Sequence, residues 1–168
     1  MITQQTVLSL VKASLNNTPA IIPSGFTLNE YLTFARKQQI EALVITGSLK
    51  SGIMVSRKEK NILPQSVLLS NQQIAVAERL YALFRTHKID YMPLKGCVLR
   101  FLYPSDALRS MGDIDILIQK TQYKQIRRLL LKEGFREGCE TDHEYVWDWH
   151  GIHIELHKRL IPDRKSVV

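Results

Sequence analysis

The sequence predicts an α+β fold, with a mixed β-sheet flanked by helices and preceded by an N-terminal helical portion. Over roughly the first half of the chain, apolar residues recur at helical spacing. From residue 88 onward, short runs of alternating or β-branched residues are separated by turn residues. The 168 residues, 45% of them hydrophobic, suit one compact unit. We expect a helical portion over 1–87 packed on an α/β core over 88–168.

The N-terminal portion is predicted to be helical. Apolar spacing places helices at 1–17, from Thr27 onward, at 40–45 as a continuation or a separate helix, and from about Pro64 to His87. Thr27 and Glu30 have the spacing of a capping box. Residues 47–56 are expected to form a loop, and the charged run 57–60 a solvated patch. This portion carries no evident chemistry, so we expect it to pack against the second half of the chain.

The second half alternates strands and helices. Strands are predicted at 89–94, 114–118, 135–139, 144–149 and 152–157, with helices at 97–103 and 121–133. Pro93 indicates a strand end or a sheet edge. Thr121 and Gly134 are expected to cap the second helix, and 149–151 to form a turn. Helices connect the earlier strands and short turns connect the later ones, which predicts a sheet with both parallel and antiparallel pairs.

Charge and cysteine content indicate which partners and which cellular location suit this chain. The chain carries 23 Lys and Arg against 16 Asp and Glu, a formal net charge of +7. This balance suits an anionic partner, but it also fits a basic protein with no such partner. Cys97 and Cys139 give neither a disulfide framework nor zinc spacing, so we expect reduced thiols. The N-terminus lacks a signal peptide pattern and no apolar run is long enough to span a membrane, which predicts a cytoplasmic protein.

Asp113 and Asp115 carry the candidate chemistry. They lie in the run 109–118, where a turn at Gly112 leads into a strand. Alternation along the strand places both carboxylates on one face and the isoleucines on the other. Paired carboxylates repel each other unless a cation lies between them, and Asp is depleted in strands. We therefore predict a hard divalent cation used in phosphoryl or nucleotidyl transfer.

A second feature is the turn at Lys95-Gly96, between a predicted strand and a short helix. A glycine turn at a helix N-terminus offers backbone N–H groups to an anion, and Lys95 adds a positive charge beside them. The motif does not match a P-loop. Arg109, shortly before the carboxylates, either pairs with Asp113 or Asp115 or contacts a substrate phosphate.

Glu155 is the third carboxylate. Its strand places Ile152, Ile154 and Leu156 on one face and Glu155 on the other. If this strand pairs with the strand of Asp113 and Asp115, the three carboxylates come within about 5–7 Å of one another. Such a group holds Mg²⁺ and, through it, a nucleoside triphosphate. Glu155 can also take a proton from the attacking hydroxyl.

Simpler interpretations exist for each of these residues. Asp113 and Asp115 can cap loops and pair with Arg109, and Glu155 can be an exposed strand residue. His153 and His157 share a strand face with Glu155, which suggests a transition-metal site of two imidazoles and a carboxylate, or a packing role for the histidines.

Three segments together resemble the DNA polymerase β-like nucleotidyltransferase superfamily. They are the Lys95-Gly96 turn, the Asp-x-Asp strand of 109–118 and the Glu-Leu-His strand of 152–157. Within it, the chain is most similar to bacterial uncharacterised nucleotidyltransferases, which carry a Lys-Gly turn and a Glu-Leu-His strand. The resemblance implies a nucleotidyltransferase-like sheet with Gly96 at the triphosphate-binding turn.

By this resemblance, Asp113, Asp115 and Glu155 are the catalytic metal ligands, for Mg²⁺ or Mn²⁺, and Lys95, Gly96 and Arg109 hold the triphosphate. The expected reaction transfers a nucleoside monophosphate from an NTP, expected to be ATP, to an unidentified hydroxyl acceptor, with release of pyrophosphate. The acceptor is a small molecule, a protein or an RNA. The alternative is a catalytically inactive protein of this fold that acts as a nucleotide sensor or an interaction module.

Overall fold

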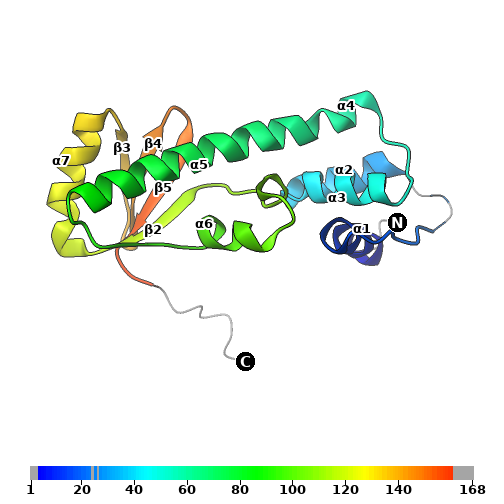
Figure 1. Ribbon diagram of the computed structural model, residues 1–168, viewed down its shortest axis with the longest axis horizontal. Helices are drawn as coiled ribbons and strands as arrows, with labels where there is room; N and C mark the ends of the chain where they lie inside the picture. Colours follow the sequence, from blue (N-terminus) through cyan, green and yellow to red (C-terminus); the bar gives the residue numbers. More distant parts are fainter. Residues whose placement is uncertain (1–3, 24, 26, 161–168) are drawn as a thin grey trace. The chain divides into compact units, whose positions relative to one another are not determined.

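The structure is a computed structural model that describes residues 4–23, 25 and 27–160 (Figure 1). The chain divides into two compact units. The first comprises Met1–Asn71 with Arg100–Ser110, and the second comprises Gln72–Leu99 with Met111–Val168. Within the described range, no helix combines the length and the apolar character that crossing a lipid bilayer requires.

The first unit is helical, as predicted. Its elements are α1 (Gln4–Asn16), α2 (Leu28–Lys37), α3 (Glu41–Lys50), α4 (Arg57–Lys60), the start of α5 (Ile62–Thr86) and the 3₁₀ turns η1 (Arg100–Leu102) and η2 (Asp106–Leu108). The core forms where α1 and α3 meet, and Leu10, Val44 and Ile45 are fully buried there. Gly47 sits so close to α1 that a Cβ atom on it would lie 2.0 Å from the Leu10 carbonyl oxygen. A glycine is therefore what allows these helices to approach.

Two local predictions in this unit are wrong. The loop expected from residue 47 begins later, because α3 continues to Lys50 through its packing on α1. The capping box expected at Thr27 is also wrong, since its side chain makes no capping hydrogen bond. A capping box begins α4 instead: Ser56 Oγ accepts from the Glu59 N–H at 3.3 Å, and Glu59 Oε2 accepts from the Ser56 N–H at 2.7 Å. The charged run 57–60 is thus one helical turn, and it has no buried residue, as a solvated patch requires.

The second unit contains the sheet. Its elements are the rest of α5, β1 (Tyr91–Pro93), α6 (Gly96–Leu99), β2 (Ile114–Ile118), η3 (Lys120–Gln122), α7 (Tyr123–Glu133), β3 (Arg136–Glu140), β4 (Glu144–Trp149) and β5 (Ile152–His157). Within the described residues, the strand order is β1-β2-β5-β4-β3. The β2–β5 pair is parallel and the other pairs are antiparallel, so the sheet is mixed, as predicted. The α+β class is confirmed.

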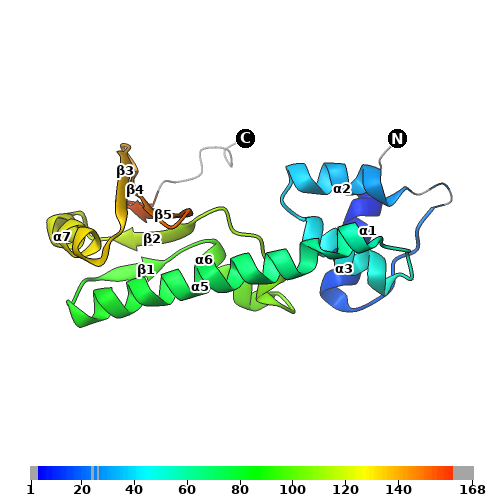
Figure 2. The ribbon, with the colours of Figure 1, turned by 90° about the horizontal axis from the view of Figure 1, so that it is seen from above.

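One face of the sheet is buried beneath α5 and α7 (Figure 2). The apolar residues of α5 and α7 pack in a single core with the isoleucines of β2 and with Trp147, Ile154 and Leu156. Because side chains alternate along a strand, the carboxylates between these apolar positions lie on the opposite face. The hydrophobic pattern therefore fixes the face on which any polar site is built.

The turns around these elements agree with the sequence, with one exception. Gly134 ends α7 with φ +91°, and His150 and Gly151 form the β4–β5 turn with φ +50° and +87°. Positive φ at both turn residues matches the twist of a hairpin. Pro93 ends the edge strand β1, as predicted. Thr121 does not cap α7, because a 3₁₀ turn precedes the helix and places Gln122 at the cap position.

Candidate active site

The site is built on the contact between β2 and β5. These strands run parallel, and their register sets Asp115 opposite Glu155. Ile114 and Ile154, one position earlier on each strand, are fully buried. The apolar residues fix the register from one face, so the two acidic side chains meet on the other. The pairing of these two strands, on which the predicted carboxylate group depended, is present.

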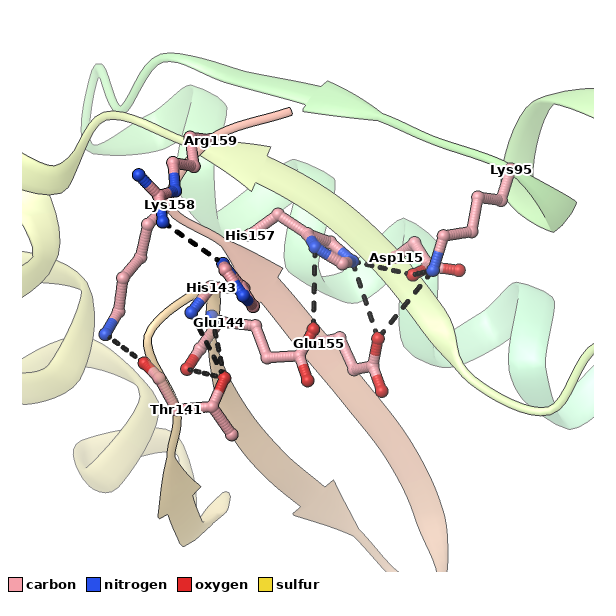
Figure 3. Close-up of polar contacts among 9 residues, drawn as sticks. All are labelled: Lys95, Asp115, Thr141, His143, Glu144, Glu155, His157, Lys158 and Arg159. Atoms are coloured by element: carbon pink, nitrogen blue, oxygen red, sulfur yellow. Dashed lines mark hydrogen bonds and ion pairs between the residues drawn. The ribbon is translucent and has the colours of Figure 1, made fainter. Parts of the chain in front are cut away.

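Asp115 is the most buried carboxylate of the group, with a residue exposure of 2%. Its Oδ1 lies 2.5 Å from Lys95 Nζ and 2.7 Å from His157 Nε2 (Figure 3). Burial alone would raise the pKa of Asp115, but the hydrogen bonds from Lys95 and then His157 outweigh it and hold that pKa below its usual value. The carboxyl group is therefore ionised near neutral pH.

Lys95 supplies the positive charge at the site. Its Nζ also lies 3.9 Å from Glu155 Oε2, so one ammonium group faces two carboxylates. Partial burial would lower the pKa of Lys95, but its hydrogen bond to Asp115 and the nearby negative charges raise it. The backbone of Lys95 has φ +44°, in the left-handed region that a residue with a side chain rarely adopts. Such strain is often found where a side chain is held for function.

Gly96 is required by packing. A Cβ atom on Gly96 would lie 2.7 Å from both Cγ and Sδ of Met111, which is buried just before Asp113. The Lys-Gly turn thus packs directly on the segment that leads into β2. After the turn, the N–H groups of Cys97 and Val98 donate to the carbonyls of Leu94 and Lys95.

Glu155 has the most perturbed acidity of the group. Burial and the negative charges of Asp113, Glu144 and Asp115 raise the pKa of Glu155 to about 7. A hydrogen bond with Asp113 also favours the protonated form. Asp113 directly precedes β2 and is half-buried. The three predicted carboxylates therefore lie close together.

The structure adds two residues to the predicted group. His157 is buried on β5, with Nε2 3.5 Å from Glu155 Oε2 and Nδ1 3.6 Å from Glu144 Oε2. Glu144 reaches it from β4, where the register pairs the two residues. The alternation of His153, Glu155 and His157 was a signal for His157, but nothing in the sequence indicated Glu144. The hypothesis of a two-imidazole metal site is wrong for the described residues, since the ligand cluster there includes His157 and not the exposed His153.

The donor set fits a divalent cation. Asp115, Glu155 and His157 each offer one ligand atom, and these atoms lie within 4.8 Å of one another. Carboxylate oxygens suit Mg²⁺ and Mn²⁺, and an imidazole nitrogen is compatible with Mn²⁺. Asp113 lies beside this group and can add a further oxygen.

Arg109 belongs to the first unit. Its guanidinium donates to the carbonyl of Ser110, directly after the turn η2. Its predicted contact with a triphosphate stays a prediction.

The chain is similar to a known protein family and, at low sequence identity, to a solved structure. The family model described as an uncharacterised nucleotidyltransferase matches residues 24–168. Among solved structures, the chain is similar to the crystal structure of ANT(2")-Ia in complex with adenylyl-2"-tobramycin, with a TM-score of 0.47 and 14% sequence identity. The match covers 55% of this chain and 53% of that one, so this chain spans about half the length of that protein. No curated protein matches the sequence significantly. By the family model, which spans most of its length, this chain belongs to the uncharacterised nucleotidyltransferase family, as its motifs indicated.

Proposed function

We propose that this protein transfers a nucleoside monophosphate from an NTP, with ATP as the donor, to a hydroxyl group and releases pyrophosphate. The acceptor is a small molecule, a protein or an RNA. The observation that carries the proposal is the register of Asp115 opposite Glu155, with Asp113 beside them and Lys95 reaching both strands. Family membership supports the same reaction class. Both cysteines are thiols, which agrees with a cytoplasmic location.

Asp113, Asp115 and Glu155 would hold Mg²⁺ or Mn²⁺, because their oxygens are the donors that these cations prefer. The bound cation would neutralise phosphate charge and help to orient the triphosphate. Without it, the buried negative charge on this face of the sheet is offset by Lys95. In the nucleotide-bound state, the divalent cation would take over this neutralisation and free Lys95 for the phosphates.

The chain's own groups have distinct tasks in this scheme. Lys95 binds the triphosphate through its ammonium group, because its side chain is 56% exposed and can turn away from Asp115. Gly96 keeps the turn close to Met111, and Arg109 adds a second positive charge for the phosphates.

Glu155 is the proposed base. As the acceptor oxygen bonds to the α-phosphorus, its proton passes to the Glu155 carboxylate, and the bond from the α-phosphorus to the oxygen shared with the β-phosphate breaks. The electron pair leaves with pyrophosphate. Glu155 is placed for this role by its register opposite Asp115, and a carboxylate can accept the proton of an attacking hydroxyl.

The test uses the full chain with Mg²⁺ and ATP labelled at the α-phosphate, incubated with small-molecule, RNA and protein fractions of a cell extract. Transfer of α-label to one fraction, with release of pyrophosphate, supports the proposal. ATP labelled at the γ-phosphate is the control, since transfer of that label would indicate a kinase instead. Asp113→Ala and Asp115→Ala should abolish α-label transfer, while Asp142→Ala, at an exposed position, should not. Binding of ATP without any transfer would instead indicate the inactive sensor.

A further inference from the structure

His157 lies between two carboxylates that come from different strands. On one side, Nε2 is 2.7 Å from Asp115 Oδ1 on β2. On the other side, Nδ1 is 3.6 Å from Glu144 Oε2 on β4 (Figure 3). The side chain of His157 is only 10% exposed, so packing restricts its rotation. The imidazole therefore connects the central acidic residue of the site to a residue that the proposed chemistry does not use.

In the hydrogen bond between His157 Nε2 and Asp115 Oδ1, the histidine is the donor. An ionised carboxylate can only accept, so the hydrogen in this bond belongs to Nε2 of His157. Lys95 donates to the same Oδ1 atom of Asp115. Within the described part of the chain, both hydrogen bonds to this carboxylate therefore fall on Oδ1, and Oδ2 is left to bind a cation.

Glu144 is itself held at the start of β4. Its N–H donates to Thr141 Oγ1 at 3.2 Å, and its carbonyl accepts from the Thr141 N–H at 2.9 Å. The strand register then sets Glu144 opposite His157. A fixed backbone on β4 thus limits where the Glu144 carboxylate can lie relative to the imidazole.

We propose that His157 is a positioning residue of the nucleotidyltransferase site: its Nε2–H group holds Oδ1 of Asp115 and leaves Oδ2 to bind the divalent cation, and the Glu144 side chain limits movement of the imidazole from the opposite side. This role rests on the proposed function. Partners that orient a metal ligand from outside the coordination sphere commonly change metal affinity about 10- to 100-fold when they are removed.

The experiment measures Mn²⁺ binding to the full chain by electron paramagnetic resonance, together with pulsed detection of nitrogen coupled to the bound ion. His157→Ala should weaken Mn²⁺ binding about 10- to 100-fold. His157→Gln, whose amide can still donate to Asp115, should recover most of that loss, and Glu144→Ala should cause a smaller loss. The control is His153→Ala, at an exposed position on the same strand, which should bind like the wild type. Thermal unfolding of each variant shows whether it is folded.

The outcomes separate this role from the proposed function. Unchanged Mn²⁺ affinity in a folded His157→Ala variant, or failure of His157→Gln to recover binding, overturns the positioning role alone. Nitrogen coupling from His157 in the wild type also overturns it, because the imidazole would then be a direct ligand. Absence of Mn²⁺ binding by the wild type overturns the proposed function and this role with it.

Discussion

The ammonium group of Lys95 lies 2.5 Å from Oδ1 of Asp115, and 3.9 Å separate it from the carboxylate of Glu155. One cation on a flexible side chain thus faces two acidic residues on adjacent strands. Solvent screens the half-exposed Lys95 end of this ion pair, but Asp115 is buried and would be left without its counter-charge if Lys95 were removed. The ion pair matters because it places a positive charge beside both carboxylates.

Replacing Lys95 with Met should separate stability from catalysis. Without a divalent cation, the melting temperature should fall, because the carboxylates lose their counter-charge, and Mg²⁺ should restore it. The KM for the NTP should rise about 10- to 100-fold, since a charged hydrogen bond to phosphate is lost. The matched control is Lys132→Met on an exposed position of α7. Equal KM values for the two variants would show that Lys95 does not bind the triphosphate.

Replacing Glu155 with Gln should stabilise the metal-free protein at high pH only. The pKa of Glu155 rises from 4.5 to about 7 on folding, so its ionisation opposes folding. Below pH 4.5 the group is protonated in both states and the substitution should be nearly neutral. The benefit should grow as pH rises from 4.5 to about 7 and level off above that, on the order of 2 kcal/mol.

Urea unfolding with a chelator at about pH 5 and about pH 8, on either side of the Glu155 transition, measures this difference. Asp142→Asn is the control, since that carboxylate is exposed in the turn before β4. A Glu155→Gln variant that is destabilised at the higher pH would show that the ionised carboxylate is favourable in the folded protein.

Replacing Gly96 with Ala should destabilise the second unit by about 1–3 kcal/mol, because the added methyl would overlap Met111. Gly112→Ala is the control, since a Cβ atom there meets nothing within 4 Å. In a double-mutant cycle, Met111→Ala should reduce the effect of Gly96→Ala, because it removes the overlapping atoms. Strict additivity of the two free energies of unfolding would contradict this packing.

Replacing Gly47 with Ala should be more damaging, by about 3 kcal/mol or more, because the added Cβ would meet the backbone carbonyl of Leu10 at 2.0 Å. A backbone atom cannot move aside as a side chain can. The control is Gly52→Ala, where space is open and only the φ of +73° is unfavourable, at about 1 kcal/mol. Circular dichroism during urea unfolding compares the two, and equal losses would refute close packing of α1 on α3.

The sequence predicted most elements of the sheet because their local signals were strong. The hydrophobic alternation of β4 and β5 indicated their boundaries, and the glycine at residue 134 indicated the end of α7. The capping box predicted at Thr27 is wrong because a threonine at this position can cap a helix, but in the described part of the chain the Thr27 side chain makes no capping hydrogen bond. Whether a residue caps a helix depends on the backbone conformation on each side of it, which the residue type alone does not specify.

The candidate site could be predicted only in part. Asp113, Asp115 and Glu155 were found because acidic residues conflict with an otherwise apolar strand. Their meeting depended on β5 lying next to β2, and local sequence does not specify strand order. Glu144 was missed for the same reason, since it reaches His157 only across the β4–β5 register.

The parallel contact of β2 with β5 also bears on how the protein folds. His157 and Asp115 are 42 residues apart in the chain, and β5 must pair with β2 before they can meet. Contacts of this separation are costly in chain entropy and form slowly. The electrostatic repulsion between Glu155 and the two aspartates is felt only when β5 pairs with β2. A divalent cation present at that moment would lower the energy of the closing step, so the ion that serves the reaction would also favour completion of the sheet.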